Sequence, residues 1–105
     1  MIPADVLDEA VRRLVAAAQP MRIILFGSHA RGDATEDSDF DLLVVLKEVT
    51  RPRAEVVRLL DVLRPLRLPV EILLYSEEQV FEWGHLPGTV LYEALAEGKV
   101  LYEAA

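Results

Sequence analysis

A polar segment, GSHARGDATEDSDFDL, spans residues 27–42 and separates two apolar runs, IILF and LLVVL. Each run has the length of a buried strand, so the segment must connect two core strands. Asp39 and Asp41 stand one residue apart where the second run begins. Because carboxylates resist burial unless they are paired or bind a cation, these two acids require a specific environment.

Apolar periodicity predicts an α+β fold in which a small mixed β-sheet is flanked by helices. Helices are expected over residues 4–19, over residues 53–64, from an N-cap at Ser76 to about Gly84, and from after Gly88 to about Glu97. Strands are expected over residues 21–27, 39–47 and 70–75, with Lys99–Glu103 as a short edge strand after a C-cap at Gly98. Residues 28–38 are expected to form a loop with room for one helical turn.

The length of 105 residues predicts a single domain, residues 1–105. A net charge of −7 and a pI of about 4.7 argue against direct nucleic acid binding through a basic surface. The absence of cysteine from the sequence excludes disulfides, thiolate metal sites and cysteine nucleophiles. No apolar run approaches the roughly 20 residues that cross a bilayer, and the acidic N-terminal segment is unlike a secretion signal. The expected location is therefore cytoplasmic, away from membranes.

The alternation of strand side chains places Asp39 and Asp41 on one face of the sheet and Phe40 on the other. Two carboxylates so placed repel each other unless a cation lies between them. Mg²⁺ prefers such oxygen ligands and completes its shell with water and substrate phosphates. Glu71 is the acid inside the third predicted strand, and it is the candidate for the third carboxylate of a two-metal site.

Gly27 and Ser28 follow the first predicted strand directly. A glycine lets a phosphate approach the backbone closely, and a serine hydroxyl with exposed backbone N–H groups supplies donors. Arg31 could add a charged donor. The segment therefore offers a phosphate cradle and a metal clamp to one ligand, as a nucleoside triphosphate would require.

The same segment resembles the signature of the DNA-polymerase-β-like nucleotidyltransferase superfamily: Gly-Ser, a small residue, Arg-Gly, then Ser-Asp-x-Asp-Leu. The small size and the ending GKVLYE resemble its minimal nucleotidyltransferase branch. The resemblance implies a polymerase-β palm-like fold. It implies that Gly27 and Ser28 hold the triphosphate of ATP and that Asp39 and Asp41 bind one or two Mg²⁺ ions. The position of the family's third acid falls on Glu71. The resemblance implies that Glu71 acts as a general base that activates the acceptor hydroxyl.

Minimal nucleotidyltransferases of this kind are commonly the antitoxin half of a pair with a HEPN-domain RNase toxin, and some transfer AMP from ATP to a tyrosine of the toxin. The resemblance thus implies a Mg²⁺-dependent protein adenylyltransferase that acts as an antitoxin in a hetero-oligomer. Two alternatives stay open. One is a catalytically idle antitoxin that neutralises the toxin by binding. The other is a free-standing nucleotidyltransferase for a small molecule, whose pocket a homodimer could complete.

Several side chains also have simpler interpretations. Arg31 either contacts phosphate or braces the loop through an internal ion pair, and Glu71 could be an exposed residue of an edge strand. His29 and His85 are expected to be surface or loop residues, because neither has metal-ligand spacing. A set of apolar residues near the C-terminus is expected to join the core, with a partner-binding patch as the alternative. These residues are Phe81, Trp83, Leu86 and Tyr92.

Overall fold

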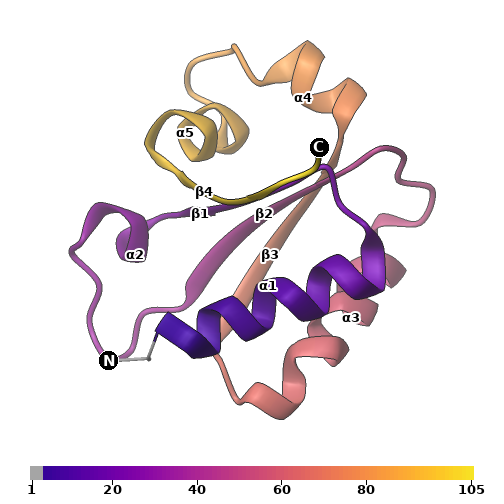
Figure 1. The fold of residues 1–105 in the computed structure, drawn as a ribbon. Helices are drawn as coiled ribbons and strands as arrows, with labels where there is room; N and C mark the ends of the chain where they lie inside the picture. The colour runs from indigo at the N-terminus through magenta and orange to yellow at the C-terminus, as the bar shows by residue number, and fades with distance from the viewer. Residues whose placement is uncertain (1–3) are drawn as a thin grey trace.

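The computed structural model describes residues 4–105 as a four-stranded sheet in the order β3-β2-β1-β4 (Figure 1). The strands are β1 (Arg22–Phe26), β2 (Phe40–Leu46), β3 (Val70–Ser76) and β4 (Lys99–Glu103). β1 runs antiparallel to both β2 and β4, whereas β2 and β3 are parallel. The sheet is therefore mixed, as the sequence predicts, and β3 and β4 are its edges.

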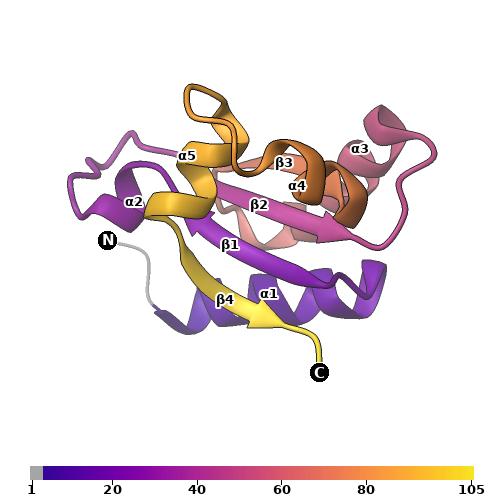
Figure 2. The same cartoon turned by 90° about the horizontal axis from the view of Figure 1, so that it is seen from above.

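Helices cover both faces of the sheet. α1 (Ala4–Ala18) and α3 (Pro52–Leu63) lie on one face, and α4 (Glu77–Trp83) and α5 (Val90–Glu97) lie on the other (Figures 1 and 2). The one helical turn expected after β1 is α2 (Ser28–Arg31), and a 3₁₀ turn, Arg64–Leu66, follows α3. Within residues 4–105, no helix is both long and apolar enough to span a bilayer.

The apolar run of β2 is buried on both sides because it is an inner strand between two helical layers. Leu42 and Val44 pack in the cluster beneath α1 and α3, whereas Leu43 and Val45 pack beneath α5. All four side chains are fully buried. Full burial of such a side chain contributes about 1.5–3 kcal/mol to stability, so β2 is the centre of the fold.

The predicted helix ends are confirmed by their caps. The Ser76 hydroxyl accepts from the backbone N–H of Gln79, and the Gln79 side chain accepts from the backbone N–H of Ser76. Thr89 caps α5 in the same way through the N–H of Tyr92. Gly98 ends α5 with extended backbone, and its N–H donates to the carbonyl of Ala94. These caps fix where the chain leaves β3 and where it enters β4.

The prediction that the C-terminal aromatic and apolar residues join the core is wrong for most of them. Phe81 is 85% exposed, Trp83 43% and Leu86 41%. These side chains stay outside the core because Leu91 and Ala94 of α5 already cover this face of the sheet. Val90 is also exposed. We call these four exposed residues, Phe81, Trp83, Leu86 and Val90, the α4–α5 patch.

Candidate active site

Gly27 lies at the end of β1, where the chain turns into α2. Its φ of +74° belongs to the region that favours glycine. A Cβ atom at this position would lie 2.2 Å from Oδ2 of Asp41, so a side chain cannot be accommodated without moving Asp41. The carbonyl of Gly27 accepts from the N–H groups of Ala30 and Arg31, both at 3.0 Å, and so starts α2. Gly27 therefore brings the loop backbone directly against an acidic side chain.

The acids meet through strand register. Asp41 is paired with Phe26 of β1 on one side and with Glu71 of β3 on the other. Asp39 precedes Asp41 by two residues and so shares its face of the sheet. That face is the one that carries α4 and α5, because Leu43 and Val45 have the same parity. The structure thus brings Asp39, Asp41 and Glu71 to one end of one sheet face.

The environment of these carboxyls raises the pKa of Asp41. The main cause is burial, and the neighbouring carboxylates of Glu71 and Asp39 add to it. His29 acts in the opposite direction. Asp41 is half-buried, whereas Asp39 and Glu71 are exposed. Its ionised form is therefore held in an unfavourable environment, which a cation would relieve.

The donor chemistry of these carboxylates suits a hard divalent ion such as Mg²⁺. Within residues 4–105, no group of three or more acidic or histidine side chains is already arranged at metal-binding spacing. The three acids share an end of the sheet through backbone register, and the carboxyls of Asp41 and Glu71 lie within hydrogen-bonding reach of each other. Glu71 is also an exposed residue of an edge strand, as its simpler interpretation holds.

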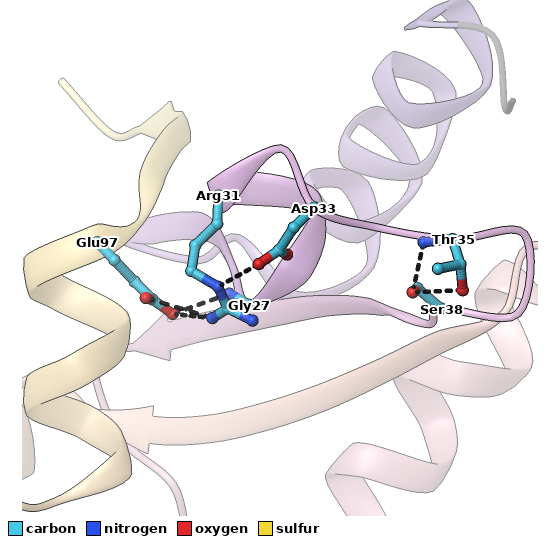
Figure 3. A network of polar contacts seen from close by, with 6 residues as sticks. All are labelled: Gly27, Arg31, Asp33, Thr35, Ser38 and Glu97. Carbon is cyan, nitrogen blue, oxygen red and sulfur yellow. Dashed lines mark hydrogen bonds and ion pairs between the residues drawn. The ribbon is translucent and has the colours of Figure 1, made fainter.

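Arg31 is held in ion pairs. Its guanidinium donates to Glu97 at 3.1 Å and to Asp33 at 3.3 Å (Figure 3). The hydrogen bonds that Arg31 donates to the carboxylates of Asp33 and Glu97 raise the pKa of its guanidinium. The structure therefore shows Arg31 bracing the loop, and its contact with phosphate stays a prediction.

Glu97 is a site residue that the sequence interpretation missed. Its carboxylate also accepts from the backbone N–H of Gly27 at 3.2 Å, so one side chain ties the end of α5 to both ends of α2 (Figure 3). A signal was present in the sequence, because an acid in the last turn of a helix opposes the helix dipole and needs a compensating partner. Arg31 and the Gly27 N–H are those partners.

The remainder of the loop is ordered by local contacts. The ring of His29 stacks on Phe40 with centroids 3.7 Å apart, and its Nε2 lies 3.2 Å from the carbonyl of Ser38. The Ser38 hydroxyl accepts from the N–H of Thr35 at 2.9 Å (Figure 3). These contacts fix the chain just before Asp39, and Ser28 opens α2 beside Gly27. His29, predicted to be a surface or loop residue, is thus a half-buried residue of α2 that orders the loop before Asp39.

Known proteins resemble this chain in sequence and in fold. Residues 9–105 match the family model described as "Polymerase beta, Nucleotidyltransferase". Two proteins of Methanocaldococcus jannaschii match short segments. "Putative protein adenylyltransferase MJ0141" is 61% identical over 28 residues, 27% of this chain and 28% of that protein. "Putative protein adenylyltransferase MJ0604" is 71% identical over 24 residues, 23% of this chain and 24% of that protein. The matched segments thus span about a quarter of each relative.

The fold comparison covers more of the chain. The crystal structure described as that of a putative nucleotidyltransferase from Sulfolobus solfataricus superposes with a TM-score of 0.60. The superposition covers 94% of this chain and 78% of that one, at 19% sequence identity. This likeness supports the fold alone.

Proposed function

This chain belongs to the polymerase β nucleotidyltransferase family, and from that membership we propose that it transfers AMP from ATP to a tyrosine hydroxyl of a partner protein. The partner that we propose is a HEPN-domain RNase toxin, with this chain as its antitoxin in the minimal nucleotidyltransferase branch. The reaction would depend on Mg²⁺. Family membership supports nucleotidyl transfer, and the names of the two archaeal relatives support a protein acceptor.

The observation that carries the proposal is the register of three strands at one end of the sheet. Asp41 is paired with Glu71, Asp39 precedes it on the same face, and Gly27 faces Asp41 with no side chain of its own. An acidic cluster beside a glycine turn that leads into a helix N-terminus would accommodate both a cation and a phosphate chain. A purely structural role would not require Gly27 to approach a half-buried carboxylate so closely.

In the proposed reaction, the acceptor oxygen attacks the α-phosphorus of ATP. A bond forms between that oxygen and phosphorus, and the bond to pyrophosphate breaks. Asp39, Asp41 and Glu71 would hold one or two Mg²⁺ ions, which supply charge neutralisation for the phosphates when bound. Glu71 would accept the proton of the acceptor hydroxyl, since its exposed carboxylate lies on the same sheet face as Asp39 and Asp41.

The turn after β1 would bind the leaving group. Gly27 allows the pyrophosphate to approach the backbone, and Ser28 with the first N–H groups of α2 would donate to its oxygens. Arg31 holds this turn in place through Glu97, and its positive charge lies near the proposed phosphate position. The loop would therefore be positioned before the nucleotide binds.

The α4–α5 patch supports a protein as the acceptor. Four large apolar side chains are exposed in the segment that covers the same sheet face as the acids: Phe81 and Trp83 in α4, Leu86 in the loop after it, and Val90 in α5. Several exposed large apolar residues within one short segment are a candidate protein-binding surface. A partner bound there would lie on the face toward which the acids point, where its hydroxyl could reach the nucleotide.

The test is intact-mass spectrometry after this protein is mixed with ATP, Mg²⁺ and the product of the neighbouring gene. We expect the partner to gain the mass of one or more AMP groups. Asp39→Asn should abolish the gain while the circular dichroism spectrum stays unchanged. Asp37→Asn is the matched control, because it removes the same charge from an exposed position of the same loop and should retain transfer. Undiminished transfer by Asp39→Asn would disprove the metal-binding assignment.

The α4–α5 patch also favours a second candidate, neutralisation of the toxin by binding without chemistry. The patch involves none of the acids, so binding could persist after catalysis is lost. The Asp39→Asn, Asp41→Asn double variant separates the two candidates in cells that express the partner. Continued protection by this variant would favour occlusion. Loss of protection with binding preserved would favour AMP transfer.

A further inference from the structure

β3 is a free sheet edge with an apolar groove beside it. β3 pairs with β2 on one side and with no other strand among residues 4–105 on its outer side. A groove of about 450 Å³ runs along this edge between β3 and α3. It is lined by Arg53, Val56, Val57, Leu73, Leu74 and Tyr75, together with Pro52 and Ile72. Val57 is 58% exposed although it is a large apolar residue.

The two edges of the sheet are protected differently. β4 is five residues long, carries exposed Lys99 and Glu103, and has a register shift in its pairing with β1. Charges, short length and irregular register are the usual means by which an edge avoids pairing with another chain. β3 is seven residues long, pairs with β2 without a shift, and contains the run ILLY with one acid, Glu71. The β3 edge therefore lacks the short length and irregular register that protect the β4 edge.

The β3 edge can pair antiparallel with a second copy of itself. In an antiparallel pair of two β3 strands, side chains that face each other must share a sheet face, so the sum of their residue numbers is even. A two-fold axis at Leu73 pairs all seven residues, with Ile72 opposite Leu74 and Glu71 opposite Tyr75. An axis at any other residue leaves part of the strand unpaired. Leu73 would then lie opposite its own copy at the centre.

α3 carries opposite charges at equal distances on either side of Val57, another residue of the groove. Arg53, Val57 and Asp61 recur at a spacing of four along α3, so they lie on one side of the helix. In an antiparallel pair of α3 helices centred on Val57, each Arg53 would face Asp61 of the other copy, and this exposed carboxylate also pairs with Arg64 of its own chain. Val57 and Leu73 both line the groove, so the centre of the α3 pair and the centre of the β3 pair belong to the same surface.

From the register of β3 and the spacing of residues along α3 we propose that the protein forms a homodimer through β3, with the sheets joined antiparallel at Leu73 and the α3 helices packed at Val57 about the same two-fold axis. The joined sheet has eight strands. The apolar groove becomes internal, and the Arg53–Asp61 pairs close its two ends.

The dimer changes the environment of the candidate active site. Directly opposite residues in an antiparallel pair have Cβ atoms about 4.5–5.5 Å apart. Tyr75 of the second copy therefore lies beside Glu71, on the sheet face that carries the acids. If the proposed function holds, on which this step rests, each copy supplies an aromatic wall to the nucleotide site of the other.

The first test is the mass in solution by analytical ultracentrifugation over a concentration series, which needs no nucleotide or partner. The wild type is expected at twice the chain mass of 11.8 kDa. Val57→Lys places two like charges at the axis and is expected to raise the dimer Kd at least about tenfold, or about 1.4 kcal/mol. Val100→Lys is the matched control, because Val100 is 56% exposed but lies on β4. A monomeric wild type, or a dimer disrupted by Val100→Lys and not by Val57→Lys, would overturn the proposal.

Charge reversal tests the α3 register. Arg53→Glu and Asp61→Arg should each weaken the dimer, because each places like charges opposite one another. The double variant restores opposite charges and should restore the dimer. Two weakening single variants with no recovery in the double variant would refute the pairing of Arg53 with Asp61.

Disulfide trapping tests the β3 register, because the wild-type sequence has no cysteine. Leu73→Cys should form a disulfide with its own copy, since the Cα separation in such a pair suits the bond. Glu71→Cys mixed with Tyr75→Cys should form a mixed disulfide, whereas each alone should not. Equal yields from Val100→Cys would show that the trapping is random collision. Failure of AMP transfer in the mass assay leaves these readouts unchanged, so the two proposals fail separately.

Discussion

Replacing Asp41 by asparagine should stabilise the protein. Burial and the carboxylates of Glu71 and Asp39 disfavour the ionised form of Asp41, and its pKa is raised. Adjacent strands lie roughly 4.8 Å apart. Two unit charges about 5 Å apart repel by about 0.8 kcal/mol at the dielectric constant of water and by about 3 kcal/mol at an effective value of 20. Glu71 is exposed, so we expect a gain near the lower limit, about 1 kcal/mol.

The assay is thermal and urea unfolding as a function of pH. A gain of about 1 kcal/mol corresponds to a rise of about 4 °C in Tm for a chain of this size. Because the folded-state pKa of Asp41 is raised, its ionisation lowers stability as pH rises from the unfolded value of about 3.9 through the folded value. The advantage of Asp41→Asn should therefore be full at pH 7 and absent below about pH 3.9. Asp37→Asn is the control, since it removes an equal charge from an exposed loop position.

Mg²⁺ should make the wild type more stable than Asp41→Asn. A cation bound by the acids stabilises the wild type in proportion to its occupancy and has less effect on Asp41→Asn. Wild-type Tm should rise through a Mg²⁺ titration while that of the variant changes little. If Asp41→Asn is less stable than the wild type at pH 7 without Mg²⁺, the view of this site as a cluster of mutually repelling carboxylates is wrong.

Three further substitutions test the scaffold of the site. Gly27→Ala should lower the free energy of unfolding in urea by about 1–3 kcal/mol, because Gly27 has a positive φ and an added Cβ would clash with Asp41. Gly88→Ala is the control, because Gly88 has a positive φ but open space around it. An equal loss of stability in both variants would rule out the clash as a cause. Glu97→Gln should lower the free energy of unfolding by under about 1 kcal/mol, because the ion pair of Glu97 with Arg31 is partly exposed. The same variant should speed hydrogen exchange at the Gly27 amide. Unchanged exchange would contradict the role of Glu97 in bracing the turn. Ser76→Ala should lower the free energy of unfolding by about 1 kcal/mol, because it removes the N-cap of α4. A loss of less than a few tenths of a kcal/mol would show that the cap is dispensable.

The order of elements could be predicted from local patterns. The alternating and continuous apolar runs, the N-cap at Ser76 and the glycines at strand and helix ends each act within a few residues, and the structure confirms them. The error concerned the α4–α5 patch. Phe81 and Trp83 are apolar and were therefore expected in the core. The sequence could not show that Leu91 and Ala94 already fill the space above the sheet.

The candidate site divides in the same way. The segment from Gly27 to Asp41 by itself determined a turn that needs a glycine and a pair of acids on one face, because both follow from backbone geometry and strand alternation. Only the tertiary structure decided that Glu71 lies beside Asp41, through the parallel register of β2 and β3 across thirty residues of chain. It alone placed Glu97 of α5 against Gly27 and Arg31. Contacts between distant segments depend on how helices and strands pack, and no local pattern in a single sequence contains that information.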